Sequence, residues 1–268
     1  MARVTESLTF DALGGECELY SIDAGGLTLE QGQVWIAHMH DRLTRFEPSS
    51  ELSRLNASAG TWFTVSPELE ALLRESLRAF EVSEGLVNVA VLPALLAAGY
   101  TRDFAAGPTA PTAPPRIAPL PSVLEVQDGA ARLAAGSAVD LGGIAKGWMA
   151  DRLAARLGDN ALVNLCGDLY ARGGGATGEG WPVGFGDRTL LLRDLGAATS
   201  GTTKRAWAGG HHLIDPRTSR PAQTDLSEVS VLAPTATDAE IYAKVALLLG
   251  SRDAPKWLES RSPGWSLA

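Results

Sequence analysis

A short segment of the sequence combines the residue types that bind a phosphate. In Asp140-Leu-Gly-Gly-Ile-Ala-Lys146, a carboxylate and two glycines precede a helix-like pattern, so the backbone N–H groups of Gly142 and Gly143 could approach a phosphate while Lys146 supplies positive charge. Short glycine-rich turns are common, however, and this spacing matches neither a P-loop nor G-x-G-x-x-G. An ordinary strand-to-helix turn with a surface lysine explains the segment equally well.

Two other segments place polar groups at the ends of predicted strands. Asn164 and Asp168 follow a strand and flank Gly167, a pattern that can line a cleft but is at least as often a simple turn. Ser200 and Arg205 belong to a run of hydroxyl groups and cations that could hold an oxyanion or a phosphate. Neither segment alone decides between a ligand site and a loop.

The tandem histidines His211 and His212 are the best candidates for moving a proton near neutral pH. Adjacent residues of a strand point to opposite faces, so at most one of them can face a shared site. A Ser-His-Asp hydrolase that uses Ser200 also fits, although the G-x-S-x-G elbow is missing around it. On the last predicted helix, Glu240 and Lys244 have i, i+4 spacing, which is typical of a surface ion pair.

The elements that must position these residues interleave helices and strands. Apolar spacing and capping residues predict helices over 29–46, 66–80, 147–157 and 236–249, the last ending at Gly250, and strands over 161–166 and 226–233. The proline-rich segment 107–121 is expected to be an exposed, stiff connection. This order favours an α+β fold with mixed or antiparallel sheets and packed helices.

Composition excludes several classes of protein. The 268 residues carry a net charge of −8, and without a basic block we expect no binding to nucleic acid. We also expect no membrane span, because no apolar run approaches the roughly 18 residues that one needs. The first residues show no signal peptide or lipoprotein cysteine, which makes a cytoplasmic location the default. Cys17 and Cys166 lack metal-ligand spacing, and Cys17 is interpreted as structural.

Taken in order, these segments resemble the ApbE-type flavin transferases, which are FAD:protein FMN transferases. The resemblance covers about Gly14 to Gly250 and rests on Ser50-Glu-Leu-Ser-Arg-Leu-Asn56, the Asp140 to Gly147 motif, Asn164 to Asp168, Ser200-Gly201 with Arg205, and His212-Leu-Ile-Asp-Pro-Arg-Thr218. It implies a single ApbE-like domain over 1–268, in which two associated α+β subdomains surround a nucleotide cleft.

The resemblance also implies an activity and a set of site residues. Such a protein binds FAD, cleaves its pyrophosphate with a divalent metal such as Mg²⁺, and transfers FMN to a Thr or Ser hydroxyl of an acceptor protein, releasing AMP. His212 would activate the acceptor hydroxyl, and the carbonyl of Ala145 and the carboxylate of Glu240 would bind the metal. The residues that would hold the nucleotide are Asp140, Gly142, Gly143, Lys146, Asn164, Asp168, Ser200, Arg205 and Asp215.

This sequence departs from the family pattern at five of these motif positions. Glu240 and Lys244 stand where the family has metal-binding Asp and Thr, and an ammonium group has no lone pair to bind a metal. Our hypothesis is that the Lys244 ammonium lies near the metal position, pairs with Glu240 and partly replaces the charge of the cation. The other departures are Cys166 and Ser219 in place of glycine, and Asn88 in place of an Asp-Pro-Thr-like stretch.

These departures leave two alternatives to transfer. The chain could bind FAD at a degenerate metal site with little or no transfer, or it could be a metal-dependent FAD pyrophosphatase.

Overall fold

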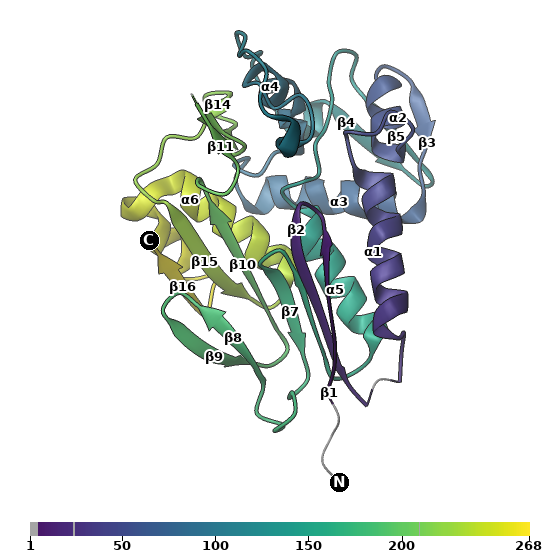
Figure 1. Cartoon of the computed structure of the whole chain (residues 1–268). Coiled ribbons are helices and arrows are strands. Elements are labelled where there is room, and N and C mark those ends of the chain that lie inside the picture. Colours follow the sequence, from purple (N-terminus) through teal and green to yellow (C-terminus); the bar gives the residue numbers. More distant parts are fainter. Residues whose placement is uncertain (1–4, 24, 209) are drawn as a thin grey trace.

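The computed structural model describes residues 5–23, 25–208 and 210–268, and its centre is a seven-stranded sheet (Figure 1). The spatial order is β1-β2-β6-β7-β10-β15-β16, and every neighbouring pair is antiparallel. The strands are β1 Thr5–Ala12, β2 Gly15–Ile22, β6 Ala161–Leu165, β7 Asp168–Arg172, β10 Leu195–Gly201, β15 Glu228–Ala233 and β16 Gly264–Leu267. The predicted α+β class is confirmed, with an antiparallel main sheet.

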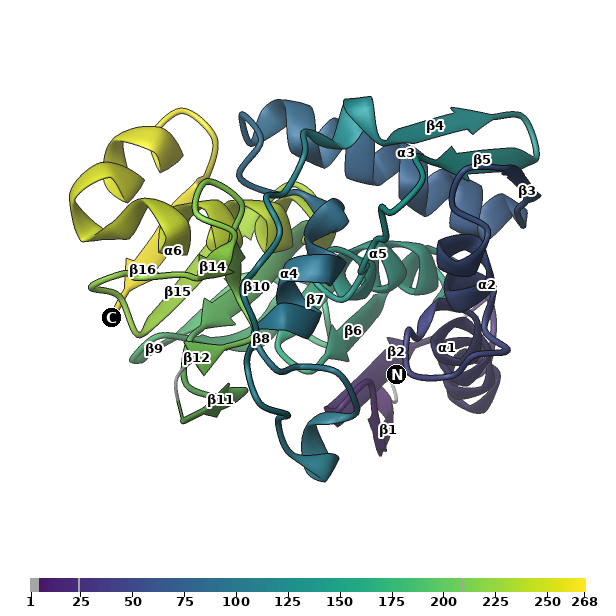
Figure 2. The same ribbon diagram turned by 90° about the horizontal axis from the view of Figure 1, so that it is seen from above.

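Three helices cover the main sheet. Helix α5, Ala145–Leu157, packs on β6 and β7, while α6, Ala236–Leu258, packs on β10 and β15, and α1, Leu29–Leu43, contacts β1 and β2. Figure 2 shows α5 between the main sheet and α3, Pro67–Val82. Ser66 caps α3 as predicted, because its Oγ accepts a hydrogen bond from the Leu69 N–H at 3.2 Å.

The remaining elements form a second layer and several hairpins. A three-stranded sheet in the order β3-β5-β4 lies beside α2 and α3. The elements of this layer are α2 Glu51–Ala57, α4 Leu92–Ala97, β3 Trp62–Thr64, β4 Leu124–Gln127 and β5 Ala130–Leu133. Three two-stranded hairpins complete the fold: β8 Trp181–Phe185 pairs with β9 Arg188–Leu192, β11 Ala206–Trp207 pairs with β12 Gly210–His211, and β13 Ile214–Asp215 pairs with β14 Arg220–Pro221.

The first turn of α6 is docked on α5 through one carboxylate. Asp151 accepts hydrogen bonds from the backbone N–H groups of Ala236 and Thr237 at 2.7 and 3.0 Å. A Cβ at Gly147 would lie 2.5 Å from the Ala236 carbonyl oxygen, so only glycine permits this approach. The contact fixes the register between the helix starts that carry Lys146 and Glu240.

The structure corrects the boundaries of three predicted elements. The first helix ends at Leu43 rather than at Phe46, and the strand predicted from Leu226 begins at Glu228. The predicted stop at Gly250 is confirmed, since Gly250 is left-handed (φ 78°) and ends the first helical stretch, but a second stretch follows it directly and extends α6 to Leu258. Asp225 stabilises this restart by accepting a hydrogen bond from the Ser251 N–H at 2.9 Å.

The proline-rich segment 107–121 is mostly exposed but is attached to the core at its end. Leu120 is fully buried, at the start of a short 3₁₀ turn. Asn88 Nδ2 donates to the Ala118 carbonyl at 2.9 Å, and the Ile117 N–H donates to Ser219 Oγ at 2.9 Å. Two of the departures from the family pattern, Asn88 and Ser219, therefore hold this connection in place. Among the described residues, no helix combines the length and apolarity that crossing a bilayer requires.

Candidate functional site

The Asp140 turn is held by residues that are distant in the sequence. Asn56 binds both backbone groups of Val139: its Nδ2 donates to the carbonyl at 2.9 Å and its Oδ1 accepts from the N–H at 2.8 Å. Asp140 pairs with Arg45, whose Nε lies 2.8 Å from Oδ2, and its Oδ1 accepts from the Gly142 N–H at 2.9 Å. The motif residue Asn56 thus shapes the turn that carries the candidate phosphate-binding glycines.

Arg45 is the functional partner that the sequence analysis missed. Its side chain is only 5% exposed, and it also donates to the carbonyl of Tyr100 at 2.8 Å and lies over the Tyr100 ring. Asp140 is 95 positions away, so no local spacing signals this ion pair.

Lys244 reaches the glycine turn from α6. Its Nζ donates a hydrogen bond to the Gly143 carbonyl at 2.5 Å, and a Cβ at Gly143 would clash with Nζ. Burial lowers the pKa of Lys244, although the nearby charges of Glu240 and Asp168 oppose this. The expectation of a direct Glu240 ion pair was wrong: Glu240 accepts from the Gly147 N–H at 2.8 Å, and the ion pairs of the described residues include none between it and Lys244.

Lys146 is not a surface lysine but forms an ion pair with Asp168. The Asp168 side chain is 3% exposed, and Glu240 is also buried. Burial lowers the pKa of Lys146, but the charges of Asp168 and Glu240 raise it by more, so the net shift is upward. Burial, together with the charge of Asp168, raises the pKa of Glu240 to about 7. Lys146, Lys244, Asp168 and Glu240 therefore form one cluster of mostly buried charges.

The two histidines separate as the strand geometry predicts. His211 is engaged with the backbone: its Nδ1 accepts from the Leu213 N–H at 3.2 Å, so its Nε2 donates to the Ala222 carbonyl at 3.0 Å. His212, in contrast, has a buried Nδ1 that finds no hydrogen-bond partner among the described residues. Burial, followed by the charges of Arg205 and Lys244, lowers the pKa of His212 to about 3, so its imidazole is neutral in the free protein.

The remaining predicted residues surround this cluster in different roles. Asn164 binds Glu18 at 2.8 Å and accepts from the Gly167 N–H, so it holds the turn that leads to Asp168. Asp215 pairs with Arg217 at 2.8 Å, and its Oδ1 accepts from the Arg217 N–H at 2.8 Å, which supports a tight turn. Arg205, Ser200 and Ala145 are positioned by other segments of the chain.

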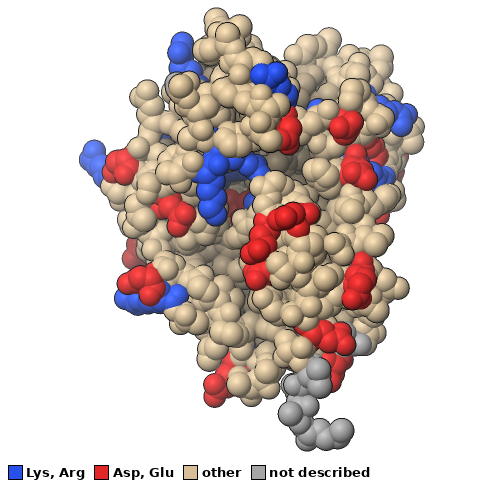
Figure 3. Space-filling view, in the orientation of Figure 1, with Lys and Arg blue, Asp and Glu red and all other residues tan. Residues whose placement is uncertain are grey.

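Arg205 reaches the carbonyl of Leu13 at 3.1 Å, in the turn between β1 and β2. Ser200 lies half-buried on β10, opposite Val229. Ala145 is buried at the start of α5. Figure 3 shows a group of basic side chains beside a hollow near the middle of this face, next to several acidic ones.

The donor set does not fit a divalent cation. Within the described ranges, no group of three or more His, Cys, Asp or Glu residues could hold a metal ion. Glu240 is hydrogen-bonded to backbone, and the Gly143 carbonyl already accepts from a protonated amine, Lys244. Carbonyl and carboxylate oxygens bind Mg²⁺, but an ammonium among them repels it.

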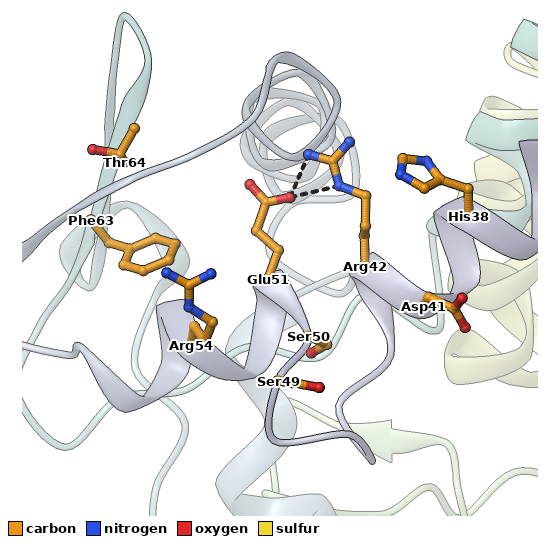
Figure 4. Close-up of a pocket in the computed structure, with 9 residues that line it drawn as sticks. All are labelled: His38, Asp41, Arg42, Ser49, Ser50, Glu51, Arg54, Phe63 and Thr64. Atoms are coloured by element: carbon orange, nitrogen blue, oxygen red, sulfur yellow. Dashed lines mark hydrogen bonds and ion pairs between the residues drawn. The ribbon is translucent and has the colours of Figure 1, made fainter.

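A separate pocket of about 490 Å³ lies between α1, α2 and β3 (Figure 4). Two of its charged residues are paired with each other: Arg42 binds Glu51 at 2.8 Å, and Glu51 also accepts from the backbone N–H and the hydroxyl of Ser66. None of the predicted site residues lines this pocket. Its polar groups serve the junction of α1, α2 and α3.

Comparisons with known proteins agree with the resemblance. A protein from Treponema pallidum named "FAD:protein FMN transferase" is 37% identical over 141 residues, which cover 43% of this chain and 39% of that protein. One of the same name from Haemophilus influenzae is 26% identical over 92% of this chain and 82% of its own length. The Treponema alignment thus covers less than half of that relative.

Solved structures show the same fold. The apo flavinyl transferase ApbE of Pseudomonas stutzeri superposes with a TM-score of 0.81 at 20% identity, over 96% of this chain and 89% of that one. The Thermotoga maritima ApbE protein gives 0.81 at 22% identity, over 96% and 91% of the two chains. The model of the ApbE family matches residues 13–266. The chain therefore belongs to the ApbE family.

Proposed function

We propose that this chain is an FAD:protein FMN transferase. The observation that carries the proposal is His212, whose buried Nδ1 has no hydrogen-bond partner in the part of the chain that the structure describes and lies in the electrostatic field of Arg205 and Lys244. A neutral imidazole held beside cations is suited to take the proton of an acceptor hydroxyl next to a bound anion. The names of the relatives supply the reaction class.

In this proposal, the hydroxyl oxygen of an acceptor Thr or Ser attacks the phosphorus of the FMN half of FAD. The bond between that phosphorus and the bridging oxygen breaks, AMP leaves with the bridging oxygen, and His212 takes the hydroxyl proton. The pyrophosphate charge is offset by Lys146, Lys244 and Arg205, and the backbone at Gly142 and Gly143 approaches the phosphates. Asp140 and Asp168 orient this set through their partners Arg45 and Lys146.

Substrate binding would strengthen His212 as a base. The positive charges of Arg205 and Lys244 contribute to the low pKa of the free imidazole. A bound pyrophosphate places negative charge beside these cations and therefore raises that pKa toward neutrality. The base is thus weak in the free protein and gains strength when FAD is present.

We propose no resident Mg²⁺ in this chain, because its donors do not fit one. We also infer that the chain is one folding unit, since one apolar cluster takes residues from Cys17 to Val245.

A second function, FAD binding without transfer, is favoured by Lys244. The ammonium neutralises charge at the Gly143 carbonyl but is not a Lewis acid. FAD would then bind while pyrophosphate cleavage is slow. A pyrophosphatase differs from a transferase only in the nucleophile, which would be water.

One experiment separates these functions. Purified protein is incubated with FAD and a peptide that carries one Thr, with Mg²⁺ or with a chelator, while AMP and peptide-bound flavin are measured. AMP with flavinylated peptide is expected in both buffers, and none with a Thr→Ala peptide or with the His212→Ala protein. AMP with free FMN would show hydrolysis, and bound FAD with neither product would show a binding protein.

A further inference from the structure

Cys17 and Cys166 bring two sulfur atoms together from distant parts of the sequence. Their Sγ atoms lie 3.8 Å apart, although 149 positions separate the residues. Cys17 is fully buried in β2, and Cys166 is partly exposed on the turn between β6 and β7. Both thiols are free.

The backbone of Cys166 is what makes this approach possible. Cys17 pairs with Leu165 across the sheet, so in a regular strand the next residue, Cys166, would point to the opposite face. Its left-handed φ of 61° turns the side chain back toward Cys17. The Cys166 N–H donates to the Glu16 carbonyl at 3.1 Å, which fixes the turn against β2.

The surroundings make the two thiols chemically different. The hydrogen bond with Cys17, followed by the charges of Lys146 and Arg205, lowers the pKa of Cys166 to about 7 against the opposing effect of burial. The same contact and burial raise the pKa of Cys17 well above its usual range. Cys166 is therefore the reactive and accessible thiol, and Cys17 is a buried partner beside it.

We propose that Cys17 and Cys166 form a reversible redox site that a peroxide oxidises to an intramolecular disulfide. The Cys166 thiolate attacks one peroxide oxygen, the O–O bond breaks, and Cys166 becomes a sulfenic acid as one water leaves. The Cys17 sulfur then displaces the sulfenic oxygen, which leaves as a second water, and the S–S bond forms. Two thiols lose two electrons and two protons, and one peroxide is reduced to two waters.

Oxidation must move the turn that leads into the candidate site. A disulfide requires about 2.0 Å between sulfurs, much less than 3.8 Å. Cys17 is held in the core, so the Cys166 turn has to shift. Two residues later, Asp168 forms the ion pair with Lys146. The disulfide would therefore weaken FAD binding by roughly tenfold, the effect of disturbing one hydrogen bond to a charged group. This last step rests on the proposed function.

The test begins with the thiols of the full chain, without FAD. Reduced protein is treated with equimolar hydrogen peroxide, and free thiols and intact mass are measured. The two thiols should disappear together, with loss of two hydrogen atoms and no covalent dimer, and dithiothreitol should restore them. In Cys17→Ala, Cys166 should stop at a sulfenic acid that dimedone traps, and in Cys166→Gly, Cys17 should stay unreacted. Independent oxidation of the two thiols, or a disulfide between chains, would overturn the site.

The second readout is FAD affinity by fluorescence titration of the reduced and oxidised protein. The oxidised wild type should bind about tenfold more weakly than the reduced form, whereas peroxide should not change the affinity of Cys166→Gly. Equal affinities in both wild-type forms would overturn the link to Asp168. If the reduced protein bound no FAD at all, the proposed function would fail instead, while the thiol measurement would still decide the redox site.

Discussion

The ammonium of Lys244 donates a hydrogen bond to the carbonyl of Gly143 at 2.5 Å, linking the middle of α6 to the glycine turn before α5. Carbonyl oxygens are ligands that a divalent cation would use, so the lysine supplies one positive charge at a place suited to an ion. This charge belongs to a side chain of the protein itself and not to a bound ion.

Replacing Lys244 by methionine tests this charge. Lys244→Met keeps the apolar stem but removes the ammonium, so we expect FAD affinity to fall about tenfold while folding stability is unchanged or higher. Fluorescence titration and urea unfolding measure the two quantities. Lys256→Met, at an exposed lysine of the same helix, is the matched control and should change neither. An unchanged FAD affinity in Lys244→Met would remove the lysine from the site.

The metal requirement should change with two substitutions. Wild-type protein should show no heat of Mg²⁺ binding and no loss of activity in a chelator. In Lys244→Thr with Glu240→Asp, the ammonium is replaced by a hydroxyl oxygen, and Mg²⁺ should bind and stimulate AMP release. Calorimetry with MgCl₂ alone checks the binding without relying on activity. Mg²⁺ binding by the wild type would contradict our account of the site.

His212 should titrate far below an ordinary histidine. Its pKa is lowered to about 3 in the folded chain, against 6.5 in the unfolded chain. The unfolded state therefore binds the extra proton between these values, and the contribution of His212 to stability is full above pH 6.5 and declines as the pH falls toward 3. NMR titration of the imidazole should show this low pKa, and FAD should raise it. In His212→Gln, the free energy of unfolding should fall less on acidification than in the wild type.

Arg45 should stabilise the fold through its contacts with Asp140 and Tyr100. Its guanidinium is 5% exposed and holds both the Asp140 carboxylate and the Tyr100 carbonyl. Arg45→Met leaves a charge without its partner, which should cost about 3–5 kcal/mol of unfolding free energy in urea. Adding Asp140→Asn should recover part of that loss. Arg188→Met, at an exposed arginine, should cost less than about 0.5 kcal/mol, and equal effects would refute the structural role of Arg45.

Two positions where the family pattern has glycine should respond differently to restoring it. Cys166 and Ser219 both adopt left-handed backbones, with φ of 61° and 59°. Cys166→Gly should stabilise the reduced protein by about 0.5–1 kcal/mol, because the strain disappears. Ser219→Gly relieves the same strain but loses the hydrogen bond to the Ile117 N–H, so its net effect should be near zero. Urea unfolding under reductant compares them, and a destabilised Cys166→Gly would disprove the strain argument.

The sequence predicts the local elements well because their signals are local. Apolar periodicity and the Ser66 cap identify the helix Pro67–Val82, and strand alternation separates His211 from His212. The stop at Gly250 is predicted correctly, but the restart after it is not, because Asp225, which accepts from the Ser251 N–H, lies 26 positions from Ser251.

Long-range pairs were not predictable in the same way. Arg45 with Asp140 and Cys17 with Cys166 depend on how the chain brings distant segments together, which no single spacing encodes. Cys17 was interpreted as structural, which its burial supports, but its contact with Cys166 was not predicted for this reason. Lys244 was expected beside Glu240, but its carbonyl partner appears only once α5 and α6 are docked.

Because Asp151 docks α6 on α5, side chains of the site can be exchanged without changing the architecture. The Ala236 and Thr237 N–H groups, and the close approach at Gly147, determine where α6 begins. Lys244 lies two turns further along the same helix and takes no part in that contact. Evolution could therefore exchange a metal ligand for an ammonium at this position, or reverse the exchange, by changing a few side chains on an unaltered scaffold.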